Sequence, residues 1–170
     1  MSKGNEKTKK LLIIIGVIVA VLLVVGLMIY NSLYTSGTVQ RSKTAVKSEN
    51  FTVDGMMFAY FYNSQYQNYA TTLSYLGVQQ GVSLKAQECP YMAEGGTWFD
   101  YLTSVTHDYV VNMLSLCEIG KSNGNELTPE DKAEIDSQLD SLTETAKSVG
   151  YSLDEYFRLV TGSAVKKKDV

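Results

Sequence analysis

The side chains in this sequence whose types suggest acid–base chemistry are its single histidine and the aspartate beside it. His107 and Asp108 could act as a general base with an orienting carboxylate. Both fall in a segment whose apolar spacing predicts a helix, and consecutive side chains on a helix point about 100° apart. We therefore interpret His107 as a polar residue at or near the surface, and we predict no catalytic site in this chain.

The two cysteines are the next reactive side chains. Cys89 and Cys117 could pair as a disulfide in an oxidising extracytoplasmic compartment. The alternative is two free thiols, because Cys117 falls on the apolar face of a predicted helix. The sequence contains no CxxC motif, so neither a redox motif nor a zinc ribbon is supported.

Five acidic residues in one short stretch raise the question of a calcium site: Glu130, Asp131, Glu134, Asp136 and Asp140. A calcium-binding loop of the EF-hand type needs a glycine at its sharp turn, and its ligands lie in a loop. These acidic residues lie within a predicted helix instead, and their stretch has no glycine. We expect a solvated acidic face, no metal and no cofactor.

Aromatic and methionine side chains give the best indication of binding. In residues 56–75 they cover more than one face of the predicted helix, which is wider than the core stripe of about 100° that a surface helix needs. One interpretation is a core with a few exposed tyrosines. The other is a groove for a client polypeptide or partner, since Met adapts its shape and Tyr offers a large amphipathic surface. The candidate client-binding residues are Met57, Tyr60, Phe61, Tyr62, Tyr66 and Tyr69.

Four helices are predicted around these residues, and the first two flank a long loop. The first helix covers about residues 56–75. The second follows Thr97, an N-cap with Asp100 three residues later, and ends near Lys121. Residues 77–96 contain glycines and a proline without a sustained period, which predicts a loop that is either functional or disordered.

The third and fourth predicted helices have the clearest start and stop signals. Thr128 is an N-cap followed by Pro129, and Gly150 supplies a left-handed stop. Ser152 opens the fourth helix and Gly162 closes it. The apolar periods of the last three helices predict buried faces formed by Trp98, Tyr101, Leu102, Val105, Tyr109, Met113, Leu116 and Cys117, by Ile135, Leu139, Leu142, Ala146 and Val149, and by Tyr156, Leu159 and Val160.

The segment Leu11–Tyr30 forms twenty consecutive residues without a charge. At about 1.5 Å per residue, such a helix spans about 30 Å, the thickness of a bilayer's hydrocarbon core. A cleaved secretory signal has a shorter apolar run and a small-x-small cleavage site, so we predict a retained signal anchor. Lys3, Lys7, Lys9 and Lys10 precede it, which favours a cytoplasmic N-terminus and an extracytoplasmic C-terminal domain in the cell membrane.

These features divide the chain into four parts. We expect a basic cytoplasmic tail at residues 1–10, a transmembrane anchor at 11–30, a flexible stalk at 31–50 and a small helical domain at 51–170. The stalk is predicted because the segment is rich in Ser and Thr and lacks an apolar period. The predicted fold class is all-α, with about four helices in the domain.

Charge is segregated along the chain. The region from Phe51 to Val165 contains fifteen acidic and five basic residues, a net charge of −10, which argues against nucleic-acid binding through a basic surface. We expect Arg41, Lys43 and Lys47 to meet lipid head groups beside the membrane. We interpret Lys166–Lys168 as a solvated helix start.

The order of the segments carries a family resemblance. The sequence FTVDG leads into a helix with YFYNSQYQNY, followed by GTW and then by LTPEDKAEIDSQLDSLTETAKSVGYSLDEYFRLVTG. In this order, residues 51–170 resemble the N-terminal chaperone region of SurA/PrsA-type foldases, which are anchored outside the cytoplasmic membrane of bacteria. The most specific part of the resemblance is Thr128 to Gly162.

The resemblance implies a helical region that binds unfolded secreted polypeptides. In that family a parvulin-type peptidyl-prolyl isomerase domain normally follows, and its histidines have no counterpart in this sequence, which ends at Val170. We therefore expect either a form that lacks a C-terminal domain or a short module whose partner is another chain. The alternative function is a structural or scaffold subunit that docks one defined partner at the cell surface.

Overall fold

The computed structural model describes residues 3–93 and 95–169, with their side chains except at residues 3–14, 16, 17 and 34. The chain divides into two compact units, Met1–Val39 and Gln40–Val170, and each is described by itself. The second unit contains all the residues that we predicted to bind a client.

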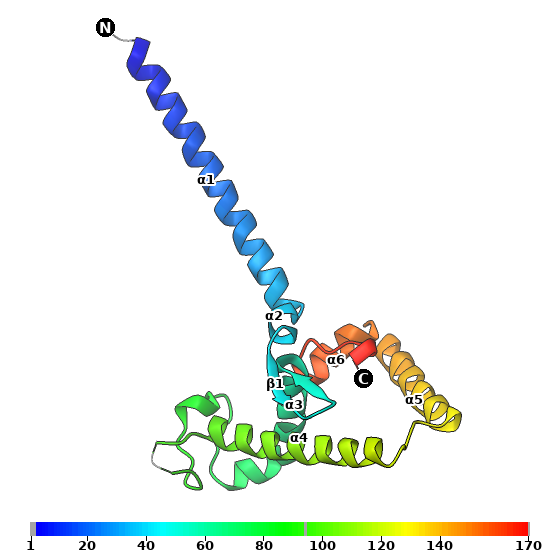
Figure 1. Ribbon diagram of the computed structural model, residues 1–170. Coiled ribbons are helices and arrows are strands. Elements are labelled where there is room, and N and C mark those ends of the chain that lie inside the picture. Colours follow the sequence, from blue (N-terminus) through cyan, green and yellow to red (C-terminus); the bar gives the residue numbers. More distant parts are fainter. Residues whose placement is uncertain (1–2, 94, 170) are drawn as a thin grey trace. The chain divides into compact units, whose positions relative to one another are not determined.

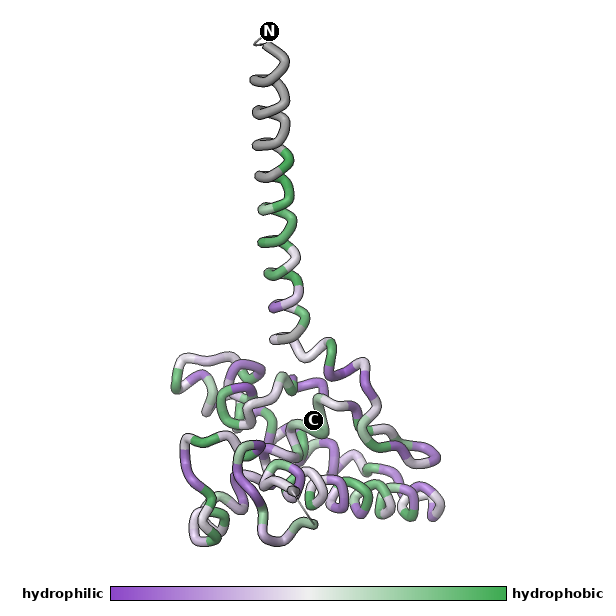
Figure 2. Tube along the Cα trace, turned by 90° about the vertical axis from the view of Figure 1, so that its left-hand side faces the viewer, coloured by the Kyte–Doolittle hydropathy of each residue, from purple (hydrophilic) through white to green (hydrophobic). Residues whose placement is uncertain are grey.

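The first unit is built on one long helix, α1 (Lys3–Thr35), drawn in blue in Figure 1. Figure 2 shows apolar residues along the part of α1 that is coloured by hydropathy. Within the described part of the chain, no helix has both the length and the apolar character needed to cross a membrane. Six side chains of the predicted anchor, at residues 11–14, 16 and 17, lie outside the described residues, so the anchor stays a prediction.

A short helical turn, α2 (Thr38–Arg41), precedes a hairpin of two strands, β1 (Thr44–Lys47) and β2 (Thr52–Asp54). The strands are antiparallel, and the buried residues Val46 and Val53 lie opposite each other. The structure thus differs from the flexible stalk predicted up to residue 50. A four-residue strand with a single buried side chain shows no period in the sequence and is recognisable only beside its partner strand.

The central helix of the second unit is α3 (Gly55–Tyr75), as predicted from the spacing of its aromatic residues. Asp54 is its N-cap, and one carboxylate oxygen accepts the backbone N–H groups of Met56 and Met57 at 3.0 and 2.8 Å. These bonds satisfy two of the four N–H groups that have no partner within the helix. The cap also ends β2, so the hairpin leads directly into α3.

The next helix, α4 (Trp98–Ser122), crosses and packs against α3 and begins with the predicted capping pair of Thr97 and Asp100 (Figure 1). Its buried side chains recur every four residues: Trp98, Leu102, Thr106, Val110 and Leu114. The predicted buried face is wrong for Tyr109, Leu116 and Cys117, which are exposed. The hairpin and α3 cover another side of α4, and beyond Leu114 no described side chain of α4 is buried.

The predicted long loop between α3 and α4 is held together by hydrogen bonds around a short 3-10 helix, η1 (Leu84–Ala86). The side-chain oxygen of Gln87 accepts the backbone N–H of Gln79 at 2.7 Å, and its nitrogen donates to the carbonyl of Val82 at 3.0 Å. Hydrogen bonds from one glutamine side chain to the loop backbone leave no periodic pattern in the sequence. The sequence therefore predicted only an irregular segment here.

The last two helices, α5 (Pro129–Ser148) and α6 (Leu153–Thr161), begin and end where their signals predict. Gly162 closes α6 with a φ of +64°, a left-handed conformation that favours glycine. A 3-10 turn, η2 (Lys167–Asp169), follows. The reciprocal capping pairs are Thr128 with Asp131 and Ser152 with Glu155.

The faces of α5 and α6 that we predicted to be buried are largely exposed. The buried residues of these helices are Ala146, Leu153 and Phe157. The residues exposed against the prediction are Ile135, Leu142, Val149, Leu159 and Val160. The reason is that α5 packs mainly on the short α6, which covers only part of its apolar stripe. In α6 itself, Leu153 and Phe157 pack beside Met56 of α3.

The described part of the chain is therefore mostly helical, with one two-stranded sheet. The all-α prediction is confirmed at the coarser level of a mostly helical fold. The four helices predicted after residue 50 correspond to α3, α4, α5 and α6. The hairpin is the element that the predicted fold class omitted.

Candidate functional site

Buried apolar side chains of the second unit gather in three clusters, and α3 contributes to each. The Trp98 cluster contains Leu73, Val78, Cys89, Trp98 and Leu102. The Val110 cluster contains Val46, Val53, Val110 and Leu114. The Phe157 cluster contains Met56, Leu153, Phe157 and Val165. A helix that packs on three sides needs apolar residues around most of its circumference, which accounts for the broad aromatic surface of α3.

Five of the six predicted client-binding residues are half-buried against these clusters. Met57 and Phe61 lie against the Val110 cluster, and Met57 also contacts the Phe157 cluster with Tyr60. Tyr62 and Tyr66 lie against the Trp98 cluster. These five side chains therefore serve mainly in packing α3 into the unit.

Tyr69 is the sixth predicted residue, and it is 44% exposed. It lies at the edge of a cleft of about 130 Å³ between the C-terminal half of α3 and the N-terminal half of α4, which we call the α3–α4 cleft. The lining residues are Tyr69, Thr72, Leu73, Leu76, Tyr101, Leu102 and Val105. The floor is formed by buried leucines of the Trp98 cluster, so the cleft opens directly onto the core.

An aromatic group adjoins this cleft on the α4 side. The ring of Tyr101 lies 5.6 Å from that of Trp98 and 6.1 Å from that of Tyr91, which comes from the loop before α4. Tyr91 and Trp98 are 5.9 Å apart in an edge-on arrangement. Edge-on and tilted rings at these separations attract each other, so Tyr101 is held as a firm wall of the cleft.

The size and lining of the cleft suit one apolar side chain. A protein cavity of about 150 Å³ lined by apolar residues accepts benzene, so about 130 Å³ has room for one ring or one branched aliphatic group. None of the seven lining residues carries a charge, and the polar groups among them are the hydroxyls of Tyr69, Thr72 and Tyr101. Such a lining favours apolar ligands with a few hydrogen-bonding groups.

Tyr62 has an unusual environment beside the Trp98 cluster. Its hydroxyl is buried without a hydrogen-bond partner among the described residues, and its ring lies 5.5 Å from that of Phe99. Burial, followed by the nearby Tyr66 and Asp100, raises the pKa of Tyr62 from 10.0 to about 12. The phenol thus stays neutral at physiological pH and acts as a packing group.

His107 and Asp108 lie closer together than we predicted from the helix geometry. The Nδ1 atom of His107 is 3.5 Å from a carboxylate oxygen of Asp108. Their side chains are 55% and 75% exposed, so water reaches both groups and the interaction is weak. The pair does not line the α3–α4 cleft. Its exposure agrees with the interpretation of His107 as a surface residue.

The cysteines and the acidic stretch also have clear positions. Cys89 is buried in the Trp98 cluster, Cys117 is exposed on α4, and both are free thiols. The acidic side chains of α5 are exposed to solvent. Across the described part of the chain, no three His, Cys, Asp or Glu side chains are placed to hold a metal ion.

Sequence reasoning selected Tyr69 but missed the rest of the cleft. Thr72, Leu73 and Leu76 follow Tyr69 at intervals of three, four and seven residues, so this face of α3 extends past Tyr69 to the C-cap residue Leu76. Tyr101 and Val105 were assigned to the buried face of α4, and both are half-buried. The missing information was the crossing of the two helices, which decides where the packing leaves a gap.

Comparison of the chain with family models, with curated proteins and with solved structures finds no match. Support for a function therefore comes from the residues of this chain and their geometry.

Proposed function

We propose that this chain is a membrane-anchored, extracytoplasmic binding module related to SurA/PrsA-type foldases, which holds apolar segments of unfolded secreted polypeptides and catalyses no reaction on them. The observation that carries the proposal is the α3–α4 cleft. Its uncharged lining and its volume of about 130 Å³ fit one apolar side chain of an extended polypeptide.

The expected affinity of such a cleft is low, as a binding protein for many clients requires. Full burial of a Leu or Phe side chain stabilises a complex by about 1.5–3 kcal/mol, and 1.4 kcal/mol corresponds to a tenfold change in Kd. Ordering the polypeptide opposes binding. One cleft therefore discriminates apolar from polar segments without holding any segment for long.

Exposed apolar side chains on α4 and α5 supply further contact surface for a client. Leu116 and Ile119 lie on the last turns of α4, and Ile135 and Leu142 lie on α5. Exposed apolar residues mark a binding site for another protein when they adjoin one another, as Leu116 and Ile119 do three residues apart on α4. They extend the surface available to an unfolded chain beyond a single cleft.

The membrane anchor is part of the proposal. The twenty uncharged residues Leu11–Tyr30 and the basic residues before them favour a single span with its N-terminus in the cytoplasm. Exposed Leu22, Leu27 and Met28 on α1 are side chains that a bilayer would cover. This topology would place the second unit where secreted polypeptides emerge.

The second candidate function is a scaffold subunit that docks one defined partner. The observation that favours it is the exposed apolar stripe of α5, where Ile135 and Leu142 lie on one helix face and the C-cap residue Val149 continues it. A regular stripe on a single helix is also what a partner helix would cover. The two candidates differ in the number and tightness of their ligands.

The test is suppression of aggregation of a reduced, unfolded client by the full chain in detergent micelles, with a prolyl-peptide isomerisation assay on the same sample. We expect suppression without isomerase activity. Failure to slow aggregation, with one tight stoichiometric complex instead, would overturn the client-binding proposal in favour of the scaffold. Isomerase activity in this chain would contradict the absence of a catalytic function.

A further inference from the structure

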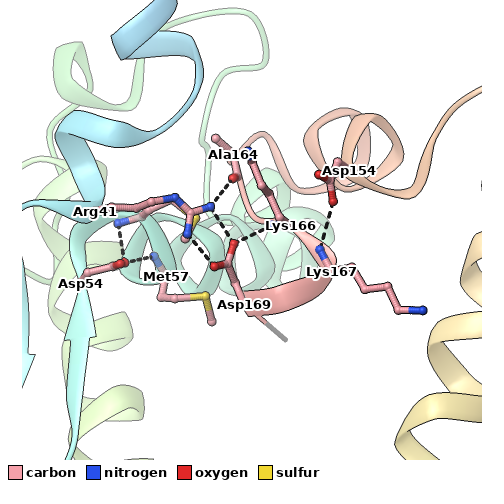
Figure 3. A network of polar contacts seen from close by, with 9 residues as sticks. Arg41, Asp54, Met57, Asp154, Ala164, Lys166, Lys167 and Asp169 are labelled. Atoms are coloured by element: carbon pink, nitrogen blue, oxygen red, sulfur yellow. Dashed lines mark hydrogen bonds and ion pairs between the residues drawn. The ribbon is translucent and has the colours of Figure 1, made fainter.

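A paired arginine and aspartate bring the two ends of the second unit together. Arg41, at the end of α2, binds Asp169, in η2, through two parallel contacts of 2.5 and 2.6 Å between guanidinium nitrogens and carboxylate oxygens. The same guanidinium donates to the carbonyl of Ala164 at 2.9 Å (Figure 3). The two side chains are 23% and 12% exposed, so solvent screens the pair only in part.

This pairing fixes the backbone of the basic triplet Lys166–Lys168. The carboxylate of Asp169 also accepts the backbone N–H of Lys166 at 2.8 Å, and Asp154 accepts the backbone N–H of Lys167 at 3.0 Å (Figure 3). The main chain is thus held, while the side chains of Lys167 and Lys168 are exposed. Lys167 and Lys168 do lie at the start of the short turn η2 with exposed side chains, as we predicted, but their backbone is held in the folded unit.

Lys43 belongs to the same neighbourhood, two residues after Arg41. Its carbonyl accepts the backbone N–H of Gly55 at 2.8 Å, and its side chain is exposed at the start of the hairpin. Three acidic groups lie nearby: Asp169 pairs with Arg41, whereas Asp54 and Asp154 accept backbone N–H groups and keep their negative charge. We call Arg41, Lys43, Lys166, Lys167 and Lys168 the basic end of the unit.

The remainder of the unit has the opposite charge. From Phe51 to Val165, fifteen acidic and five basic residues give a net charge of −10. Two of these acidic residues, Asp54 and Asp154, lie beside Arg41, and the four lysines of the basic end outnumber them. Another acidic residue, Asp140, approaches the Nζ of Lys167 at 3.5 Å, but both side chains are more than half exposed, so that attraction is weak. An anionic surface would therefore attract the basic end and repel the acidic body.

The basic end also lies close to the predicted membrane in sequence. Arg41 follows Tyr30, the last residue of the predicted anchor, by eleven positions, which span at most about 40 Å even when fully extended. We infer that the basic end binds the anionic head groups of the lipid bilayer and so orients the unit on the membrane. This inference rests on the anchor in the proposed function. Binding of this kind weakens with salt, because the Debye length is only about 10 Å at 0.1 M.

The test is lysine acetylation of the full chain in nanodiscs, with labelling rates read by mass spectrometry. One preparation contains phosphatidylcholine alone, and the other also contains phosphatidylglycerol. We expect Lys43 and Lys166–Lys168 to label several-fold more slowly in the anionic discs, with the difference lost at high salt. Lys85, Lys132 and Lys147 lie outside the basic end and serve as internal references that should label equally in both. Inorganic phosphate added to neutral discs should give no protection.

Two variants show whether the triplet drives the effect. Replacing Lys166–Lys168 by glutamines leaves the backbone bonds to Asp154 and Asp169 in place, and it should abolish the protection of Lys43 in anionic discs. The matched control, Lys132→Gln with Lys147→Gln, should keep it. Equal labelling in both lipid compositions, or protection that persists without the triplet, would overturn the inference alone. A chain that does not co-purify with nanodiscs at all would overturn the anchor, and the inference with it.

Discussion

Glu118 on α4 binds Asn50 in the hairpin turn through both carboxylate oxygens. One oxygen accepts the backbone N–H of Asn50 at 2.7 Å, and the other accepts its side-chain amide at 2.6 Å. The hydroxyl of Ser48 donates to the same carboxylate at 2.6 Å. A single side chain thus attaches the turn between β1 and β2 to a helix about seventy residues further along the chain.

Replacing Glu118 should loosen the hairpin. The hydrogen bond from Ser48, followed by those from Asn50, lowers the pKa of Glu118 below its usual 4.5. A lowered pKa in the folded state means that the contribution to stability is present above pH 4.5 and is lost as the pH falls through the folded value. We expect Glu118→Ala to lower Tm by a few degrees at pH 7. The loss of Tm on acidification should also be smaller in this variant than in the original chain. An equal loss in the exposed control Glu126→Ala would contradict this role.

Leu102 should be among the most costly residues to truncate. It is 1% exposed in the Trp98 cluster, and Leu→Ala changes at buried sites cost about 2–5 kcal/mol. We expect Leu102→Ala to reduce the free energy of unfolding by that amount in urea titrations of the full chain in detergent. Leu116→Ala on the same helix should change it by less than about 0.5 kcal/mol, because Leu116 is 69% exposed. Equal effects would contradict the burial of Leu102 and the exposure of Leu116 in α4.

The contrast between these two leucines shows how far the sequence determines the fold. Helix ends were predictable because Thr128, Ser152 and Gly162 act through local hydrogen bonds and backbone conformation. The face that each helix buries was less predictable. The apolar residues of α4 cover more than one face, and only the position of α3 decides that Leu102 and Val110 are buried while Leu116 is not.

The candidate site was predictable to a similar extent. An aromatic surface on α3 was evident in the sequence, and Tyr69 lies at the cleft. The half-buried positions of Tyr60, Phe61 and Tyr66 depend on packing partners from the hairpin, which directly precedes α3, and from α4 and α6, which are distant in sequence. The spacing of residues on one helix cannot show which part of its surface another element covers.

Changes in the α3–α4 cleft should weaken client binding without unfolding the unit. Tyr69 and Leu76 are 44% and 41% exposed, so polar replacements there cost little stability. Burial of such a side chain against a client contributes about 1.5 kcal/mol or more, which corresponds to about a tenfold change in Kd. We expect Tyr69→Ser with Leu76→Gln to raise the Kd for an apolar, unfolded peptide by about that factor in fluorescence anisotropy.

The matched control for the cleft is Leu127→Gln, an exposed leucine in the connection between α4 and α5. It removes a similar apolar side chain away from the cleft and should leave the Kd unchanged. Circular dichroism should show the same helix content in both variants. A cleft variant that binds as tightly as the original chain would exclude the cleft as the binding site.

Tyr62→Phe should stabilise the protein. The hydroxyl is buried without a partner among the described residues, and an unsatisfied buried polar group costs about 1–3 kcal/mol. Its removal should raise the free energy of unfolding by about 1 kcal/mol, whereas Tyr75→Phe, at a highly exposed position, should not change it. Burial raises the pKa of Tyr62 from 10.0 to about 12, so the unfolded state ionises first and the fold loses stability as the pH rises from 10.0 to about 12. That part of the alkaline destabilisation should be missing in Tyr62→Phe, and a destabilised variant would mean that the hydroxyl has a partner.

The pairing of Arg41 with Asp169 should be measurable as a coupling energy. The two contacts are bidentate, and hydrogen bonds between charged groups contribute about 1.5–3 kcal/mol when they are partly buried. We expect a double-mutant cycle of Arg41→Gln and Asp169→Asn to give a coupling of about 1–3 kcal/mol, with faster hydrogen exchange at residues 164–169 in each single variant. Arg41→Lys should keep only part of the coupling energy with Asp169, because an ammonium cannot form the two parallel bonds.

The acid dependence of this pair gives an independent measurement. The hydrogen bond from Arg41 holds the pKa of Asp169 below its ordinary value of 3.8, so the coupling should be complete above that pH and should fall as the carboxylate is protonated. The exposed pair of Lys147 and Glu144, three residues apart on α5, is the control and should give a much smaller coupling, because solvent screens both charges. The same small coupling in both cycles would contradict this prediction. It would mean that solvent screens Arg41 as fully as Lys147, and that only backbone hydrogen bonds hold η2.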